Sequence, residues 1–295
     1  MDPEPQNIQL VLDELTEKLE QANLVYGQGA IDASSESVWI LSHCLKIPPI
    51  EVIDNIEEVC PDDARNIAIE IASKRITSRE PLGYILGESW LMGVPFFSDN
   101  RSIIPRSFIA ELISDGSLDP WLPAGGKALD LCTGNGSLAI LLALNCPDIE
   151  VSATDISLPA LALAAKNLDR HQLTDRIQVY QGDLWDPLPE PNEENLFDLI
   201  ISNPPYVNAD SMASLPNEFL LEPNLALAGG QDGMDLVRKI IFGAKSFLSE
   251  RGALVIEIGN EYENFCAAFP EISTIWLEVS AGEQQVLLIE AENLP

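Results

Sequence analysis

The sequence has 295 residues, of which 46% are hydrophobic and 21% charged. These proportions are ordinary for a globular protein and exclude a disordered or fibrous chain, and the length allows one large domain, alone or with a smaller companion. The 47 Asp and Glu against 16 Lys and Arg leave a formal net charge of −31. Because so acidic a surface repels phosphate, we do not expect binding to nucleic acid or to an anionic membrane. A basic protein partner fits better, although the charge could also serve solubility alone.

Cysteine and histidine usage excludes several kinds of site. The five cysteines are scattered and contain no Cys-x-x-Cys pair, so we expect reduced thiols, and neither histidine has the neighbours of a metal ligand set. The chain opens on Met1-Asp2-Pro3-Glu4-Pro5, which is acidic where a secretory signal is basic. No apolar stretch approaches the roughly 20 residues of a membrane span. We therefore expect a cytoplasmic protein without a metal.

Helical periodicity runs through residues 1–80. Apolar residues recur every three to four positions over 8–22, 38–45 and 64–76, which places them on one face of each helix. We predict a small helical domain over 1–80 that packs against the rest of the chain or docks a partner. Residues 81–106 are rich in glycine, proline and aromatic side chains, which favours a connector containing a β-hairpin.

From residue 107 to 295, short apolar runs alternate with helical patterns, which is typical of an α/β fold built on a parallel sheet. The expected strands are 127–132, 150–154, 176–180, 197–202 and 253–258. The expected helices between them are 138–145, 158–171 and 236–248. Segments 275–279 and 285–289 are close enough in sequence to form an antiparallel hairpin. We predict seven strands with a reversed edge strand.

A glycine-containing loop, Asp130-Leu131-Cys132-Thr133-Gly134-Asn135-Gly136, joins the first expected strand to a helix. Its glycines allow a ligand to approach the backbone, and the helix start offers unpaired N–H groups. Asp155 ends the next strand, where a carboxylate can accept hydrogen bonds from ribose hydroxyls. Asp183 follows the third strand and could accept from an adenine amino group, with Leu184 against the ring. Each feature alone also fits a turn or a dinucleotide site, but together they favour an adenosine-containing cofactor.

The fourth strand ends in Ser202-Asn203-Pro204-Pro205-Tyr206. The two prolines lack N–H groups and stiffen the backbone, so the Asn203 side chain and the Pro204 carbonyl can act as fixed hydrogen-bond acceptors. A planar –NH₂ group has two hydrogens that these acceptors could take, and Tyr206 offers a ring face for stacking. A purely structural turn would also accommodate this sequence. We interpret it as a site that methylates an amino or amide nitrogen.

These residues resemble the class I S-adenosylmethionine methyltransferases that modify planar nitrogens, and more narrowly the glutamine amide methyltransferases. The similarity extends to 81–87, 103–106, 222–227 and 229–233, and so covers essentially the whole chain. It implies a Rossmann-like methyltransferase domain over 107–295, a substrate-recognition role for the helical domain, and S-adenosylmethionine as cofactor. The reaction it implies is methylation of the side-chain amide nitrogen of a glutamine.

The resembled family has two common branches, one acting on peptide-chain release factors and one on ribosomal protein L-three. Release-factor enzymes follow Pro-Arg with Pro-Glu-Thr-Glu, whereas this chain continues Pro105-Arg106 with 107–112, Ser-Phe-Ile-Ala-Glu-Leu. With the 130–134 loop and segment 210–216, this favours the ribosomal-protein branch and a basic ribosomal protein as substrate. A release factor remains the alternative. Trp90 and Asn135 depart from the usual residues, but neither change removes a polar group that the chemistry needs.

The resemblance also implies roles for individual residues. Catalytic roles fall to Asn203, Pro204, Pro205 and Tyr206. Cofactor contacts fall to Asp130, Cys132, Thr133, Gly134, Asn135, Gly136, Asp155, Ile156, Asp183, Leu184 and Asn203. Substrate contacts fall to Arg106, Glu111, Asn203, Pro204, Pro205, Tyr206 and Glu222.

Three other functions compete with this one. A DNA adenine methyltransferase shares the Asn-Pro-Pro-Tyr loop but needs a basic groove, which the acidity disfavours. A dinucleotide oxidoreductase is weaker, because the loop lacks the third glycine of the usual fingerprint. A non-catalytic ribosome assembly factor with a vestigial cofactor pocket differs from an enzyme only in turnover.

Overall fold

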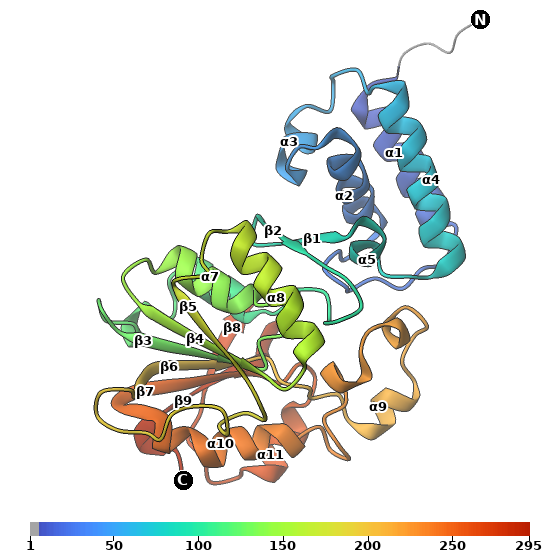
Figure 1. The fold of residues 1–295 in the computed structure, drawn as a ribbon. Helices are drawn as coiled ribbons and strands as arrows, with labels where there is room; N and C mark the ends of the chain where they lie inside the picture. The colour runs from blue at the N-terminus through green and yellow to red at the C-terminus, as the bar shows by residue number, and fades with distance from the viewer. Residues whose placement is uncertain (1–5) are drawn as a thin grey trace, which may run out of the picture. The chain divides into compact units, whose positions relative to one another are not determined.

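The computed structural model describes residues 6–295 (Figure 1), which divide into two compact units. The first comprises the described part of Met1–Asn100 together with Pro216–Leu221, and the second comprises Arg101–Leu215 and Glu222–Pro295. The acidic opening segment, residues 1–5, lies outside the described residues. Within residues 6–295, every helix is too short or too polar to cross a bilayer.

The first unit is mainly helical, as the periodicity predicts. Its elements are α1 (Ile8–Glu20), α2 (Ala33–Leu45), α3 (Pro49–Asp54), α4 (Asp62–Ser78), α5 (Leu82–Leu86), β1 (Glu88–Leu91) and β2 (Val94–Phe97). Helices α1 and α2 begin after Asn7 and Asp32, whose side chains accept hydrogen bonds from the backbone N–H groups of the first turn. The expected hairpin is confirmed, since β1 and β2 pair in antiparallel register. Helices α3 and α5 were not predicted, because five or six residues are too few for a period to be recognised.

A buried ion pair lies inside this helical unit. The Arg75 and Glu36 side chains are only 1% and 5% exposed, and Nη2 of Arg75 lies 3.1 Å from Oε1 of Glu36. The same guanidinium donates to the backbone carbonyl of Val25. A second carboxylate, that of Glu218, accepts from Arg79 and from the backbone N–H of Val25. Segment Pro216–Leu221 is thereby attached to the helical unit although it follows in sequence from the sheet unit.

The second unit is built on a seven-stranded sheet in the order β5-β4-β3-β6-β7-β9-β8. Its strands are β3 (Lys127–Leu131), β4 (Glu150–Asp155), β5 (Ile177–Gln181), β6 (Phe197–Ser202), β7 (Leu248–Glu257), β8 (Ile275–Val279) and β9 (Gly282–Glu290). The first five run parallel, and β9 is antiparallel to both of its neighbours. The antiparallel hairpin is confirmed.

One detail of the predicted sheet is corrected. The reversed strand is β9, which lies inside β8, so the edge strand itself runs in the same direction as β7. Burial explains this placement: β9 carries four consecutive fully buried apolar residues, Val286 to Ile289, whereas most of β8 is partly or fully exposed. The more apolar strand of a hairpin gains more from the interior position.

Helices cover both faces of this sheet (Figure 1). The α-helices of this unit are α6 (Ile109–Ser114), α7 (Ser137–Asn145), α8 (Leu158–Arg170), α9 (Ala209–Ala213), α10 (Asp235–Phe247) and α11 (Tyr262–Ala268), and its 3₁₀ turns are η1 (Asp119–Trp121), η3 (Asn224–Ala226) and η4 (Ala291–Asn293). The turn η2 (Phe219–Leu221) belongs to the first unit. Of the α-helices, α7 and α8 lie on one face, and α10 and α11 on the other (Figure 1). Helices α7, α8 and α10 match the predicted ranges to within one residue at each end. Between the sheet and helices α10 and α11, the core is formed by apolar side chains of β3, β6, β7, β9 and these two helices.

Candidate functional site

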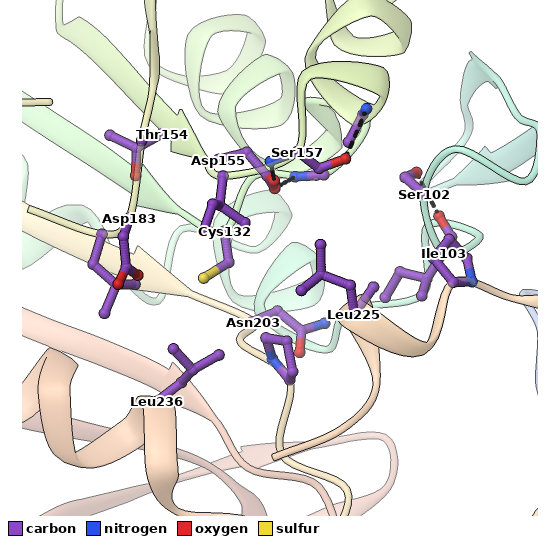
Figure 2. Close-up of a pocket in the computed structure, with 18 of the residues that line it drawn as sticks. Ser102, Ile103, Cys132, Thr154, Asp155, Ser157, Asp183, Asn203, Leu225 and Leu236 are labelled. Carbon is purple, nitrogen blue, oxygen red and sulfur yellow. Dashed lines mark hydrogen bonds between the residues drawn. The ribbon is translucent and has the colours of Figure 1, made fainter. Parts of the chain in front are cut away.

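A pocket of about 250 Å³ opens at the carboxyl ends of the central strands of the second unit (Figure 2). The chain moves outward from β3 to β4 and β5, then returns to place β6 on the other side of β3. Ligands of open α/β sheets bind at such a point of reversal. Eight of the predicted site residues line the pocket: Cys132, Gly134, Asp155, Ile156, Asp183, Leu184, Asn203 and Pro205.

The loop after β3 supplies one wall. Its backbone takes left-handed conformations, with φ of +61° at Cys132, +58° at Gly134 and +83° at Gly136. A Cβ on Gly136 would lie 3.2 Å from the Cβ of Ala164, so this glycine lets α7 pack closely against α8. The predicted contacts Thr133, Asn135 and Gly136 are not among the pocket-lining residues. Thr133 and Asn135 are buried and support the loop from beneath.

Asp130 lies beneath the same loop and is fully buried. Its Oδ2 accepts from Thr133 Oγ1 at 2.5 Å and from the Ala139 backbone N–H at 3.1 Å. Its Oδ1 has no hydrogen-bond partner among the described residues. Burial raises the pKa of Asp130 to about 7, because a charge is costly to remove from water. Asp130 is therefore a support for the loop with one unused acceptor atom.

Asp155 ends β4 and faces the pocket (Figure 2). Its Oδ2 accepts from the backbone N–H of Gly134 and its Oδ1 from that of Ser157, both at 2.8 Å. Burial raises the pKa of this carboxyl, against the effect of the two backbone hydrogen bonds. Because a carboxylate has about four lone-pair positions, Asp155 can accept further hydrogen bonds from a ligand.

Asp183 and its neighbours form the wall after β5. Its Oδ2 lies 3.2 Å from Nζ of Lys239, an ion pair that is about half exposed to solvent. Lys239 and Leu236 come from α10, and Leu225 from η3, and all three line the pocket. None of these three residues was predicted to line the site, because no local sequence motif indicates which distant segments pack against the ends of the strands. The resemblance at 222–227 was the only signal that pointed near Leu225.

Some residues of the loop after β6 line the pocket and others pack behind it. Asn203 and Pro205 line the pocket, whereas Pro204 and Tyr206 do not. The Tyr206 hydroxyl donates to Oε1 of Glu257 at 3.3 Å. Main chain packs closely around Tyr206: a Cβ on Gly259 would lie 2.5 Å from its ring, and one on Gly229 2.6 Å from its Cα. The hydroxyl end of Tyr206 is thus held by the protein interior.

The predicted substrate residues Arg106 and Glu222 pair with each other. Arg106 donates from Nη1 to Oε1 at 2.6 Å and from Nη2 to Oε2 at 2.9 Å, a bidentate geometry. Oε1 of Glu222 also accepts from the Ile104 backbone N–H. Neither residue lines the pocket, but Ile103, which precedes Ile104, and Pro223, which follows Glu222, do. The pair therefore holds two pocket segments together.

Glu111 is not brought to the pocket. Its two carboxylate oxygens accept from the backbone N–H and the hydroxyl of Ser280, between β8 and β9. The sequence motif placed Glu111 near Arg106, but helix α6 begins at Ile109 and turns the chain toward the sheet edge. Its contacts support a structural role at the hairpin.

The comparisons with known proteins agree with this geometry. The family described as methyltransferase small domain matches residues 117–230. The chain is 44% identical over 289 residues to the ribosomal protein uL3 glutamine methyltransferase of Burkholderia pseudomallei, covering 94% of this chain and 92% of the relative. The protein of the same name from Bradyrhizobium diazoefficiens is 38% identical over 290 residues, covering 94% and 88%.

A solved structure extends the likeness in fold. The catalytic domain of hMettl16 covers 97% of this chain and 91% of its own, with a TM-score of 0.51 at 14% identity. The class I methyltransferase fold is confirmed, and the relatives carry the name of the ribosomal-protein branch that the sequence favoured. With relatives this similar over nearly the whole chain, the protein belongs to the family of ribosomal protein uL3 glutamine methyltransferases.

Proposed function

We propose that this protein transfers a methyl group from S-adenosylmethionine to the side-chain amide nitrogen of a glutamine in ribosomal protein uL3. The observation that carries the proposal is the amide side chain of Asn203, which lines the same pocket as the carboxylates of Asp155 and Asp183. Family membership supplies the substrate. The pocket supplies an acceptor group beside a place for an adenosine-containing donor.

The residues of the pocket fit such a donor. Asp155 keeps unused lone pairs that suit ribose hydroxyls, and Asp183 can accept from an exocyclic amino group. Apolar side chains of Ile156, Leu184 and Leu236 offer surfaces for a planar base. Asp130 is fully buried and is not among the pocket-lining residues, so its unpartnered Oδ1 would reach a cationic ammonium group of the cofactor through a water molecule. When bound, the cofactor supplies an electrophilic methyl group on a positively charged sulfur.

The chain's own contribution is to orient a weak nucleophile. An amide nitrogen shares its lone pair with the carbonyl, and the Asn203–Tyr206 loop holds no strong base. We infer that Asn203 Oδ1 and the Pro204 carbonyl accept the two hydrogens of the glutamine –NH₂. This arrangement aims the nitrogen and stabilises the positive charge that develops on it. The rigid Pro204-Pro205 pair keeps both acceptors in place.

A basic protein substrate would give the acidic charge of the enzyme a use. Ribosomal proteins that bind RNA phosphates are basic, so a chain of net charge −31 attracts such a partner over a distance and speeds their encounter. The helical unit is the candidate surface for recognising uL3, and the cytoplasm, where ribosomal proteins are made, is the expected compartment. Direct contact with nucleic acid is not part of the proposal.

Replacing Asn203 tests the reaction. In Asn203→Ala, loss of one acceptor is expected to lower kcat about 10²- to 10³-fold, while calorimetry still detects S-adenosylmethionine binding. Asn145→Ala is the matched control, because that side chain donates to the Leu141 carbonyl within α7 and is not among the pocket-lining residues. An Asn203→Ala protein with near-normal turnover would remove Asn203 from the mechanism.

A further inference from the structure

A buried carboxylate stands directly behind the acceptor loop. Glu257, the last residue of β7, is 2% exposed. Strands β6 and β7 are paired in parallel up to Ser202 and Ile256, so Glu257 lies beside the point where the chain leaves β6 for Asn203. Its position is set by the register of the sheet.

Three donors converge on this carboxylate from two separate segments. Oε1 accepts from the Tyr206 hydroxyl at 3.3 Å. Oε2 accepts from the Ser107 hydroxyl at 2.6 Å and from the Phe108 backbone N–H at 2.8 Å. One carboxyl group therefore joins the acceptor loop to segment 101–108, whose residues Ser102 and Ile103 line the pocket.

The energetic cost of burying the Glu257 carboxylate argues against a role in packing alone. Burial raises the pKa of Glu257, because a charged group loses its hydration there, and an apolar side chain would fill the same space without that penalty. The close approach of Gly259 to the Tyr206 ring leaves little room for the ring to move. With Gly259 against its partly buried ring and its hydroxyl bonded to Glu257, Tyr206 is held in one orientation, and Pro205 precedes it directly.

We propose that Glu257 is a positioning residue for methyl transfer, which fixes the Asn203–Tyr206 loop against segment 101–108 through the Tyr206 hydroxyl and Ser107. The proposal rests on the proposed function, since it deepens the account of the same site. Glu257 touches neither reactant and acts through Tyr206. Its loss moves the acceptor atoms of the loop, and misplacement by about 1 Å can cost about 10²-fold in rate.

The kinetic test compares Glu257→Ala, Glu257→Gln, Tyr206→Phe and the Glu257→Ala/Tyr206→Phe double variant. In Glu257→Ala we expect kcat to fall about 10- to 10²-fold, with the KM for S-adenosylmethionine within about threefold, because Asp155 and Asp183 follow other strands. Glu257→Gln should recover most of the lost kcat, since its carbonyl can accept from Ser107 and Phe108 while its –NH₂ donates to the Tyr206 oxygen. The effects of Glu257→Ala and Tyr206→Phe on kcat should not add in the double variant, because both remove the same hydrogen bond.

The matched control is Asp198→Asn at the opposite end of β6. Asp198 accepts from the Lys127 backbone N–H and from the Ser249 hydroxyl, so this variant changes a structural carboxylate of the same sheet. We expect it to lower Tm without changing kcat. If Glu257→Ala and Tyr206→Phe likewise lower only Tm and leave kcat at the wild-type value, Glu257 is structural and the proposal is overturned.

Hydrogen exchange separates this failure from failure of the proposed function. Wild-type protein that transfers no methyl group to uL3 would refute the function, and the positioning role would then be read from exchange in the full-length chain. We expect peptides covering 203–208 to exchange faster in Glu257→Ala and at close to the wild-type rate in Glu257→Gln, while peptides from β4 are unchanged in both. Unchanged exchange over 203–208 would overturn the positioning role whatever the acceptor protein is.

Discussion

The carboxylate of Asp155 gives the most quantitative test of the cofactor site. Asp155→Ala removes an acceptor whose two oxygens are already aligned by backbone N–H groups of Gly134 and Ser157 at 2.8 Å. Hydrogen bonds to a charged group contribute about 1.5–3 kcal/mol each. Losing two contacts to ribose hydroxyls at the low end of that range costs about 3 kcal/mol, which weakens S-adenosylmethionine binding about 10²-fold.

Titration calorimetry with S-adenosylmethionine measures this loss directly. Asp155→Asn keeps one carbonyl oxygen and should show an intermediate loss of about tenfold, since one charge-assisted contact is replaced by a neutral one. Asp169→Ala removes an exposed carboxylate from α8 and controls for the change in net charge. A Kd for Asp155→Ala within about threefold of wild type would refute the placement of ribose on this residue.

Three further predictions concern charge. Burial raises the pKa of Asp130 to about 7, above the value of about 3.9 in an unfolded chain. The contribution of Asp130 to stability is therefore full below about pH 4 and is lost as pH rises through 7. The Tm of Asp130→Asn should gain on that of the wild type between pH 5 and 8, and a constant difference between the two Tm values would contradict this. Glu36→Ala leaves Arg75 charged and buried, which should lower the free energy of unfolding, measured by urea denaturation, by about 3–5 kcal/mol. Glu14→Ala, in the more exposed pair with Arg65, should lower it by at most about 1 kcal/mol. The value of kcat/KM for uL3 should fall as salt rises, and indifference to salt would mean that the net charge of −31 serves solubility alone.

The sequence predicted best where the pattern is repetitive and local. The apolar runs of β3 to β6 and the periodic segments of α7, α8 and α10 are long enough to identify, because burial of a whole face leaves a clear period. The position of β9 inside β8 could not be read from the sequence, because a hairpin can add to a sheet by either strand. That choice depends on which strand buries more apolar surface once the sheet exists.

The same distinction holds at the site. Asp155, Asp183 and Asn203 were predicted together, and they line one pocket because parallel strands end at one edge of the sheet. The 130–136 motif could not tell which of its residues face a ligand, and Asn135 and Gly136 proved to support the loop. Lys239 and Glu257 were missed because each meets the site only through tertiary packing.

Methylation of a glutamine side chain in uL3 can be tested directly with the purified protein. The most direct measurement offers labelled S-adenosylmethionine to the purified protein with unmodified uL3 and an unmodified release factor side by side, followed by peptide mass spectrometry to locate the label. We expect label on the side-chain amide of a glutamine in uL3, and almost none when Asn203→Ala replaces the wild type. Label on the release factor alone, or no transfer to either protein despite measurable cofactor binding, would rule out uL3 as the substrate.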